Sequence, residues 1–442
     1  MISSHSLYTK VTGQLKTGHA RDLIIIFSIQ GFALLTSLGI SLIVTNLLGA
    51  AAYGAYSFGF SAVNLLAVFC CMGYEQLALK EIPALRTQGK TNFIRGYFLY
   101  SLRNVAIVSV LVSLLLFGFS YLFQKPSDEL LRCGLWIAIP VLPLIALVNL
   151  RLSWLRSFHF NALSQIPDKV IRPAFFLVTL LICYFLWKEE MNVTIIILLS
   201  GVSIVVAFIV SKLLVANKIG NIVAGIPPAY DKLKWTKVAF SLLLVNGMYC
   251  YLSQIQILAL GSLKGAKETG VFAIASRLAD LEGYMLFAMN VVLAPMISKL
   301  FAENKIQELQ KLITSSLRIG FIFSLPIIIC FLIFPSFFLG LFGDEFGEGK
   351  FALILLTLSQ VVNFATGSVG YLLTMTGHQS TAILLLIIAS LLTTLMCILL
   401  IPALGVNGAA ISAAVNNVVL NVLMAIAVKR KIGINATLLN FT

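Results

Sequence analysis

Of the 442 residues in the sequence, 59% are apolar and 11% are charged, whereas about 25% of residues are charged in an ordinary soluble domain. A soluble chain of this length could not cover so much apolar surface with polar groups, so the composition excludes a cytosolic enzyme, a secreted domain and a disordered regulator. The net charge of +14 is spread in short groups of Lys and Arg between apolar runs. Such spacing is typical of membrane topology signals and argues against nucleic-acid binding.

Uncharged runs of the length that crosses a bilayer, about 20 residues, recur along the chain. Eight of them lie at 23–45, 51–74, 104–124, 133–150, 191–211, 238–263, 319–343 and 379–401. The stretch 351–428 carries no Asp, Glu, Lys or Arg in 78 residues. Breaks at Gly377 and Pro402 divide this stretch into three spans. One of them, 379–401, is already counted above, so the stretch adds two. A short run at 173–187 and a charged run at 271–298 complete a prediction of twelve transmembrane helices.

Basic residues predict the orientation of these helices. With the N-terminus inside, the cytoplasmic segments carry 24 Lys and Arg and the outer loops carry six. The six are Lys125, Arg132, Lys188, Lys264, Lys267 and Lys350. This bias predicts that both termini are cytoplasmic. The short outer loops leave no room for a folded extracytoplasmic domain.

Matches at a constant offset indicate an internal duplication. The motif Ser-Leu-Arg at 101–103, before the third span, recurs at 316–318, before the ninth, at an offset of 215. His159 and His378, after the fourth and tenth spans, are 219 positions apart. Because each half has six spans, the halves would be related by an axis along the membrane normal. The predicted parts are a six-helix bundle at 1–211, a basic cytoplasmic connector at 212–237 and a second six-helix bundle at 238–442.

Cysteines and histidines give no sign of a metal site or a cofactor. The seven cysteines lie within or at the ends of apolar runs, with no CxxC pair, and the four histidines do not cluster. Packed thiols explain this pattern. An ATP-driven pump is not expected either, because Ala84 occupies the first glycine position of a phosphate loop that would end at 89–91.

Three segments resemble signatures of one transporter superfamily. They are Leu48-Gly49 with Tyr53-Gly54-Ala55-Tyr56 after the first span, Glu-Thr-Gly-Val-Phe-Ala-Ile-Ala-Ser-Arg-Leu at 268–278, and Ile-Pro-Ala-Leu-Gly-Val-Asn-Gly-Ala-Ala at 401–410. They resemble the multidrug/oligosaccharidyl-lipid/polysaccharide (MOP) exporters. In length and span count the whole chain is most similar to the Wzx-type oligosaccharide flippases of that group.

The resemblance implies an all-α polytopic membrane protein, with twelve transmembrane helices in two six-helix bundles forming a V around a central cavity. Spans one, two, seven and eight would line the cavity. The implied function is to flip undecaprenyl-diphosphate-linked oligosaccharide, such as an O-antigen unit for lipopolysaccharide biosynthesis, to the periplasmic leaflet of a bacterial inner membrane. Alternating access would move it, and the resemblance also implies assembly with a polysaccharide polymerase.

Arg277 is the first candidate for substrate binding. It lies inside the predicted eighth span, where an arginine costs about 2.5–3.5 kcal/mol unless it faces water or a partner. Its planar fork of donors suits phosphate oxygens. The structural alternative is an ion pair with Asp280 on the next turn.

Two carboxylates accompany Arg277 in this span. Asp280 shares a helical face with Arg277, and Glu282 does not. Intramembrane carboxylates often mark ion paths, so either one is a candidate for coupling to H+ or Na+. The alternative is a hydrogen bond that orients neighbouring helices.

Polar stripes follow three other predicted spans. Their members are Asn246, Tyr249, Ser253 and Gln256 on span seven, Asn64 and Glu75 on span two, and Gln30 on span one. Such side chains could bind sugar hydroxyls, or they could join membrane helices to one another. The sequence leaves both interpretations open.

Arginines also stand at the predicted cytoplasmic ends of three spans. Arg21, Arg103 and Arg318 fit a topological role with contact to membrane phosphates, and capture of the substrate diphosphate is the alternative. A cation-coupled multidrug antiporter of the same superfamily is the main competing function. It would favour an acidic pocket, whereas Arg277 favours an anionic cargo. A membrane polymerase, an acyltransferase and a structural scaffold fit the pattern less well.

Overall fold

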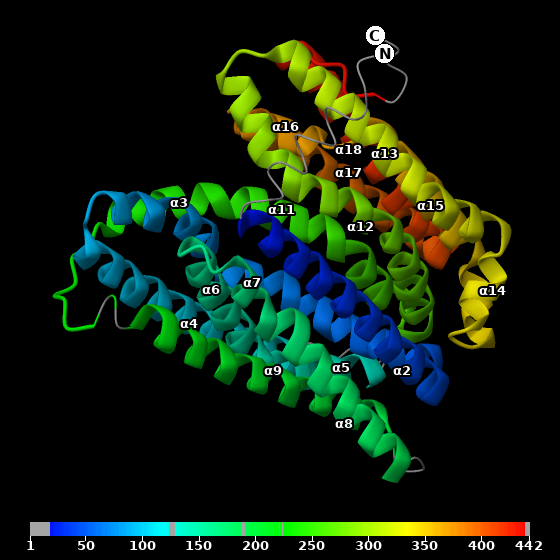
Figure 1. Cartoon of the computed structure of the whole chain (residues 1–442). Coiled ribbons are helices and arrows are strands. Elements are labelled where there is room, and N and C mark those ends of the chain that lie inside the picture. The colour runs from blue at the N-terminus through cyan, green and yellow to red at the C-terminus, as the bar shows by residue number, and fades with distance from the viewer. Residues whose placement is uncertain (1–17, 123–128, 187–190, 221, 223, 438–442) are drawn as a thin grey trace. The chain divides into compact units, whose positions relative to one another are not determined.

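The computed structural model describes residues 18–122, 129–186, 191–220, 222 and 224–437, and every regular element in these ranges is a helix (Figure 1). Residues 1–17, at the predicted cytoplasmic N-terminus, and the predicted outer-loop residues Lys125 and Lys188 lie outside the described residues.

The α-helices, in chain order, are α2 (Gly18–Cys70), α3 (Tyr74–Thr87), α4 (Thr91–Leu122), α5 (Glu129–Ala138), α6 (Leu142–Ser157), α7 (Asn161–Gln165), α8 (Arg172–Leu186), α9 (Val193–Val215), α11 (Lys232–Lys264), α12 (Ala266–Ala302), α13 (Ile306–Ile333), α14 (Pro335–Gly340), α15 (Lys350–Thr366), α16 (Val369–Met375), α17 (Gln379–Leu404) and α18 (Val406–Ile432). Short 3-10 segments lie at η1 (Ile139–Val141) and η5 (Asp344–Gly349), and π-helical segments at η2 (Ile166–Ile171) and η4 (Ala216–Gly220).

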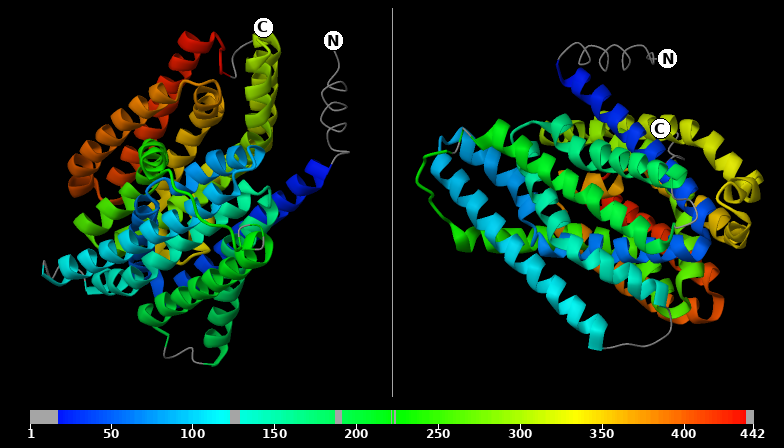
Figure 2. Two further views of the ribbon diagram at one scale, coloured as in Figure 1. Left: turned by 90° about the vertical axis from the view of Figure 1, so that its left-hand side faces the viewer. Right: turned by 90° about the horizontal axis from the view of Figure 1, so that it is seen from below.

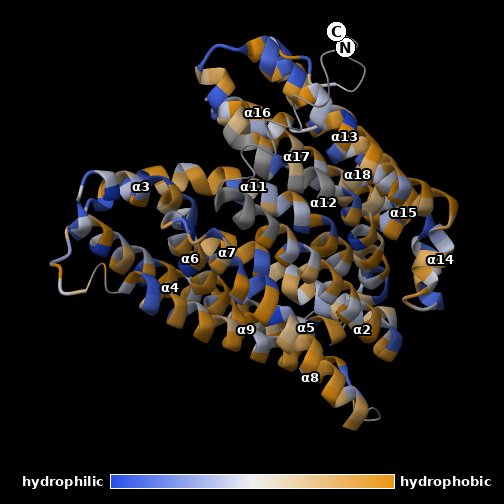
Figure 3. Ribbon diagram, viewed as in Figure 1, coloured by the Kyte–Doolittle hydropathy of each residue, from blue (hydrophilic) through white to orange (hydrophobic). Residues whose placement is uncertain are grey.

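The described helices account for the predicted crossings. Ten segments of the described chain are long and apolar enough to span a membrane, and hydrophobic residues predominate along α8 and α9 (Figure 3). One of these ten, α2, has 53 residues, enough for two crossings. The 37-residue α12 is also long enough, although its internal charges lower its hydropathy. The prediction of an all-α polytopic membrane protein is therefore confirmed.

Positive φ angles decide where the first helices bend and end. Gly49 interrupts α2 with φ 76° and ψ −173°, a conformation that glycine adopts without steric cost. Met72 and Gly73 turn the chain with φ angles of 50° and 77°. As a result Glu75 lies in the first turn of α3 and does not continue the polar face of the second span, contrary to the sequence prediction.

The chain forms two compact units. The first comprises residues 1–43, 66–122 and 137–243. In it α6 packs against α3, α4 and α9, and α8 packs against α9 (Figure 2). Large aromatic side chains fill its interior, with the Tyr97 and Trp235 rings at right angles and 5.3 Å apart.

The second unit comprises residues 44–65, 123–136 and 244–442. In it α18 packs against α15 and α17, and α12 packs against α13 and α15. Its core contains Leu309, Leu372, Leu386 and Val428, all buried.

The units differ from the predicted halves in two places, because 44–65 and 123–136 group with the C-terminal helices. The boundary at 243 lies close to the end of the predicted connector, 237. The duplication, the three-part division and the V-shaped arrangement stay predictions.

Candidate functional site

Two of the signature segments meet in the second unit through their glycines. A Cβ atom on Gly54 of α2 would lie 1.8 Å from the carbonyl oxygen of Ala266. A Cβ atom on Gly270 of α12 would lie 2.0 Å from the carbonyl oxygen of Ala50. Such distances exclude any side chain at either position. The absence of side chains therefore brings α2 and α12 into backbone contact.

This contact places Arg277 beside the same helix. One guanidinium N–H of Arg277 donates to the Tyr53 hydroxyl at 2.7 Å. Tyr53 is only 2% exposed and Arg277 is half-buried. Because the phenol is neutral, this hydrogen bond orients the guanidinium without neutralising its charge.

The carboxylates of α12 lie on different faces, as their spacing predicts. Asp280 is exposed and lies within the electrostatic range of Arg277. Glu282 is 0% exposed, and neither of its carboxylate oxygens has a hydrogen-bonding partner among the described residues. The Thr357 hydroxyl of α15 is close enough to interact with it, although neither group has a partner in the described chain that meets hydrogen-bond geometry. A buried carboxylate in this state is costly unless it holds a proton or a cation.

The kink of α2 is fixed by residues far along the chain. The Ala50 N–H, which opens the helix after Gly49, donates to Glu345 Oε2 at 2.8 Å. The Asn46 side chain donates to the Leu341 carbonyl at 3.0 Å. A carboxylate at a helix N-terminus satisfies a free N–H and interacts favourably with the helix dipole. The segment α14–η5 thus holds the bend that positions Tyr53.

The predicted stripe on α11 is partly accessible. Tyr249 is 40% exposed and Ser253 is exposed, whereas Asn246 is half-buried and Gln256 is buried. Cys250 contacts the backbone of Asn64, which places α2 beside α11 at this level of the second unit. Tyr249 and Ser253 are therefore the α11 side chains that a ligand could reach.

Other predicted residues lie in the first unit. The Gln30 amide donates to Gln165 Oε1 at 2.8 Å, an interhelical hydrogen bond that fits the structural interpretation. Glu75 is buried. Neither residue belongs to the unit that contains Arg277.

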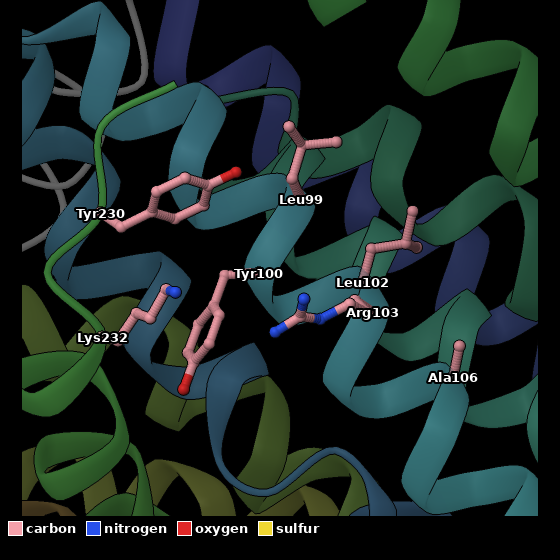
Figure 4. A pocket seen from close by; sticks show the side chains of 7 residues that line it. All are labelled: Leu99, Tyr100, Leu102, Arg103, Ala106, Tyr230 and Lys232. Carbon is pink, nitrogen blue, oxygen red and sulfur yellow. The ribbon is translucent and has the colours of Figure 1, made fainter. Parts of the chain in front are cut away.

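The three arginines predicted at helix ends have different surroundings. Arg103 is exposed and lines a pocket with Lys232 (Figure 4). Arg318 of α13 is exposed. Arg21 lies in the first turns of α2, and its side chain is outside the described residues.

Sequence reasoning missed Tyr53, Glu345 and Lys232 as site residues. Tyr53 was visible as part of a signature, but its hydrogen bond spans 224 positions. The contact of Glu345 with Ala50 spans 295 positions. Lys232 is one of several lysines in a basic segment, and nothing in that run distinguishes it.

Comparisons with known proteins give a consistent picture. Residues 19–301 match the family model described as "Polysaccharide biosynthesis protein", and residues 238–399 match the model described as "MatE". The protein described as "Probable low-salt glycan biosynthesis flippase Agl15", from Haloferax volcanii, is 25% identical over 182 residues. That match covers 40% of this chain but only 38% of the relative.

Solved structures show the same fold. An inward-facing multidrug resistance MATE family transporter of the MOP superfamily superposes with a TM-score of 0.77 at 15% identity, over 93% of this chain and 98% of its own. A MOP superfamily transporter from Pyrococcus furiosus, described as having a binding pocket of reverse polarity that suggests a different function, gives 0.67 at 17% identity. That match covers 93% of this chain and 94% of the other.

Proposed function

The chain belongs to the polysaccharide biosynthesis protein family, and from this premise we propose that it flips an undecaprenyl-diphosphate-linked oligosaccharide across a membrane. It is a multi-pass MOP superfamily transporter, a flippase and not an enzyme. The cargo we propose is a surface polysaccharide repeat unit of the O-antigen kind. It would pass from the cytoplasmic to the periplasmic leaflet of a bacterial inner membrane, with both termini of the protein cytoplasmic.

The physical problem is the polar head of such a lipid. A diphosphate and several sugars must cross about 30 Å of hydrocarbon, while the polyprenyl chain can stay in the lipid. The transporter needs a fixed positive charge for the diphosphate and hydroxyl or amide groups for the sugars. Alternating access would expose these groups to each leaflet in turn.

The position of Arg277 is the observation that carries the proposal. It is a guanidinium on a long helix of the second unit, oriented by a neutral hydroxyl at 2.7 Å. Two parallel N–H groups of a guanidinium can bind two phosphate oxygens. We assign the diphosphate to Arg277, with the exposed Tyr249 and Ser253 of the same unit as donors to sugar hydroxyls.

Glu282 is our candidate for coupling to an ion gradient. Its buried carboxylate, without a partner among the described residues, favours the protonated or cation-bound state. Replacing it by glutamine mimics the protonated form. We expect Glu282→Gln to exchange lipid between leaflets but to lose the response to an imposed H+ or Na+ gradient. An unchanged response would remove Glu282 from the coupling mechanism.

A cation-coupled multidrug antiporter is the second candidate function. The match of residues 238–399 to the MatE model and the fold of the multidrug transporter favour it. Arg277 argues against it, because a fixed cation repels cationic drugs. The two functions differ in the charge of the cargo, which is negative for the glycan lipid and positive for the drug. One transport assay can therefore distinguish them.

The test uses the full-length protein in liposomes containing an undecaprenyl-diphosphate-linked oligosaccharide. Access of the glycan to a membrane-impermeant glycosidase measures its movement between leaflets. We expect wild-type protein to expose the inner pool, Arg277→Ala to abolish movement, and Arg277→Lys to restore little, because an ammonium lacks the planar fork. Arg132→Ala, which removes an arginine elsewhere in the second unit, is the matched control.

Two results would contradict the proposal. Full activity of a folded Arg277→Ala protein would remove the phosphate role. Ion-driven efflux of an organic cation, with no movement of the glycan lipid, would support the antiporter instead.

A further inference from the structure

The first unit contains a pocket of about 500 Å³ beside α4 and the beginning of α11 (Figure 4). Its lining residues are Leu99, Tyr100, Leu102, Arg103, Ala106, Tyr230 and Lys232. Arg103 and Lys232 approach the pocket from different elements, with the Tyr100 ring between them and the Tyr230 ring to one side (Figure 4). The pocket therefore combines two cations with two phenols and an apolar wall.

Backbone contacts hold the pocket in shape. The Ala229 N–H donates to the Asn92 carbonyl of α4 at 3.0 Å. This hydrogen bond attaches the loop that precedes Tyr230 to α4. A Cβ atom on Gly96 would lie 1.8 Å from the Ala229 carbonyl oxygen, so only glycine permits this approach. The Tyr100 hydroxyl is hydrogen-bonded to Thr236 at 3.0 Å. These contacts hold the residues around Tyr230 and Lys232 against α4 without a bound ligand.

The charges of the pocket are not balanced by carboxylates. Within the described part of the chain, neither Arg103 nor Lys232 forms an ion pair. Lys234, two residues further on, is paired with Glu81 at 2.6 Å. The Lys232 ammonium lies 5.2 Å from the centre of the Tyr230 ring. This is a cation–π contact with an uncharged ring, so it does not neutralise the lysine. Two unbalanced cations in one pocket favour an anion with several oxygens.

An apolar track leads away from this pocket along α4. Ile107, Leu111 and Leu114 follow Arg103 at helical spacings of three and four, and all are more than half exposed. From Arg103 to Leu114 the helix rises about 16 Å. This is close to one leaflet, about half of a 30 Å hydrocarbon core. The track has the length and the polarity to contact a lipid chain.

We propose that this pocket binds the phosphodiester of an anionic glycerophospholipid, whose acyl chain lies on the apolar track of α4. A volume of about 500 Å³ can hold a glycerol phosphate headgroup. The phosphate would accept hydrogen bonds from Arg103 and Lys232, and the Tyr230 hydroxyl would face the glycerol. The site is separate from Arg277, which lies in the second unit, so it does not rest on the transported cargo.

Native mass spectrometry of the delipidated full-length protein tests the site. Dioleoylphosphatidylglycerol is titrated against dioleoylphosphatidylcholine, undecaprenyl diphosphate and inorganic phosphate. We expect one preferred phosphatidylglycerol adduct, weakened about tenfold or more in the double variant Arg103→Gln/Lys232→Gln, since basic residues near anionic lipid each contribute to its binding. Lys212→Gln/Lys218→Gln removes two exposed lysines of the same unit and should leave the adduct unchanged. Thermal unfolding in detergent checks that both variants fold.

Each other outcome overturns the proposal in a specific way. Equal adducts in the wild-type protein and the Arg103→Gln/Lys232→Gln variant would remove the site. Equal binding of phosphatidylcholine would show that charge does not matter. Displacement by inorganic phosphate would identify an anion site without a lipid chain. Preference for undecaprenyl diphosphate, lost in the same variant, would make the pocket a docking site for the cargo.

Discussion

Gly54 of α2 and Gly270 of α12 stand backbone to backbone, with the Cβ position of Gly270 only 3.0 Å from the nitrogen of Gly54. We expect Gly270→Ala to force the helices apart and to cost about 1–3 kcal/mol, as overpacking does. Thermal unfolding in detergent measures this. Gly283→Ala is the control on the same helix, since its Cβ would meet nothing within 4 Å. Equal loss of stability in the two variants would show that the contact is unimportant.

Tyr53→Phe removes the hydroxyl that orients Arg277 and leaves the ring in place. A hydrogen bond to a charged group contributes about 1.5–3 kcal/mol, so we expect glycan-lipid transport to fall about tenfold while the fold persists. Transport by proteoliposomes is the measurement. Tyr251→Phe, which loses a hydroxyl bond to Thr394 at 2.6 Å, should transport normally; if it fails equally, the effect is structural.

Glu345→Ala removes the acceptor for the Ala50 N–H after the kink. Loss of a helix cap costs about 0.5–2 kcal/mol, so we expect a lower unfolding temperature and weaker transport, because the bend carries Tyr53. Glu348→Ala breaks only an exposed ion pair with Lys267 and should change neither. The same result from both variants would argue against a capping role.

The hydrogen bond between Gln30 and Gln165 allows the stability gained from one interhelical contact of the first unit to be measured. A double-mutant cycle with Gln30→Leu and Gln165→Leu should give a coupling energy of about 0.6 kcal/mol, typical of hydrogen bonds between membrane helices. Chemical unfolding in micelles supplies the four free energies. Strictly additive effects would mean that the observed bond contributes no net stability.

The sequence predicted the long helices well because their signal is long and simple. Charge-free runs of about 20 residues identify crossings whatever packs around them. The short helices α3, α14 and α16 were not anticipated, since hydropathy over such lengths carries little information. The sequence also separated the first two spans at 45–51, and the non-helical backbone of Gly49 interrupts the long helix α2 within that interval.

The site was predictable only where one residue stood out against its surroundings. Arg277 is conspicuous in an apolar helix, so composition alone marks it. Tyr53 is not conspicuous, and its role depends on a helix approach that two glycines permit. Glu75 was placed on the polar face of the second span, but the turn at Met72 and Gly73 puts it in the first turn of α3. Contacts of this kind depend on tertiary packing and leave no local pattern.

The kink of α2 also bears on biogenesis. The acceptor for the Ala50 N–H is the Glu345 carboxylate, and the acceptor for the Asn46 amide is the Leu341 carbonyl; each lies 295 residues after its donor. During synthesis the first helical hairpin therefore enters the membrane well before its stabilising partners exist. The second unit closes only when its C-terminal part has been made, so its contacts are intrinsically slow to form. A chain cut short before residue 341 would lack both acceptors, so the N–H of Ala50 and the amide of Asn46 would have to wait for the C-terminal half of the protein.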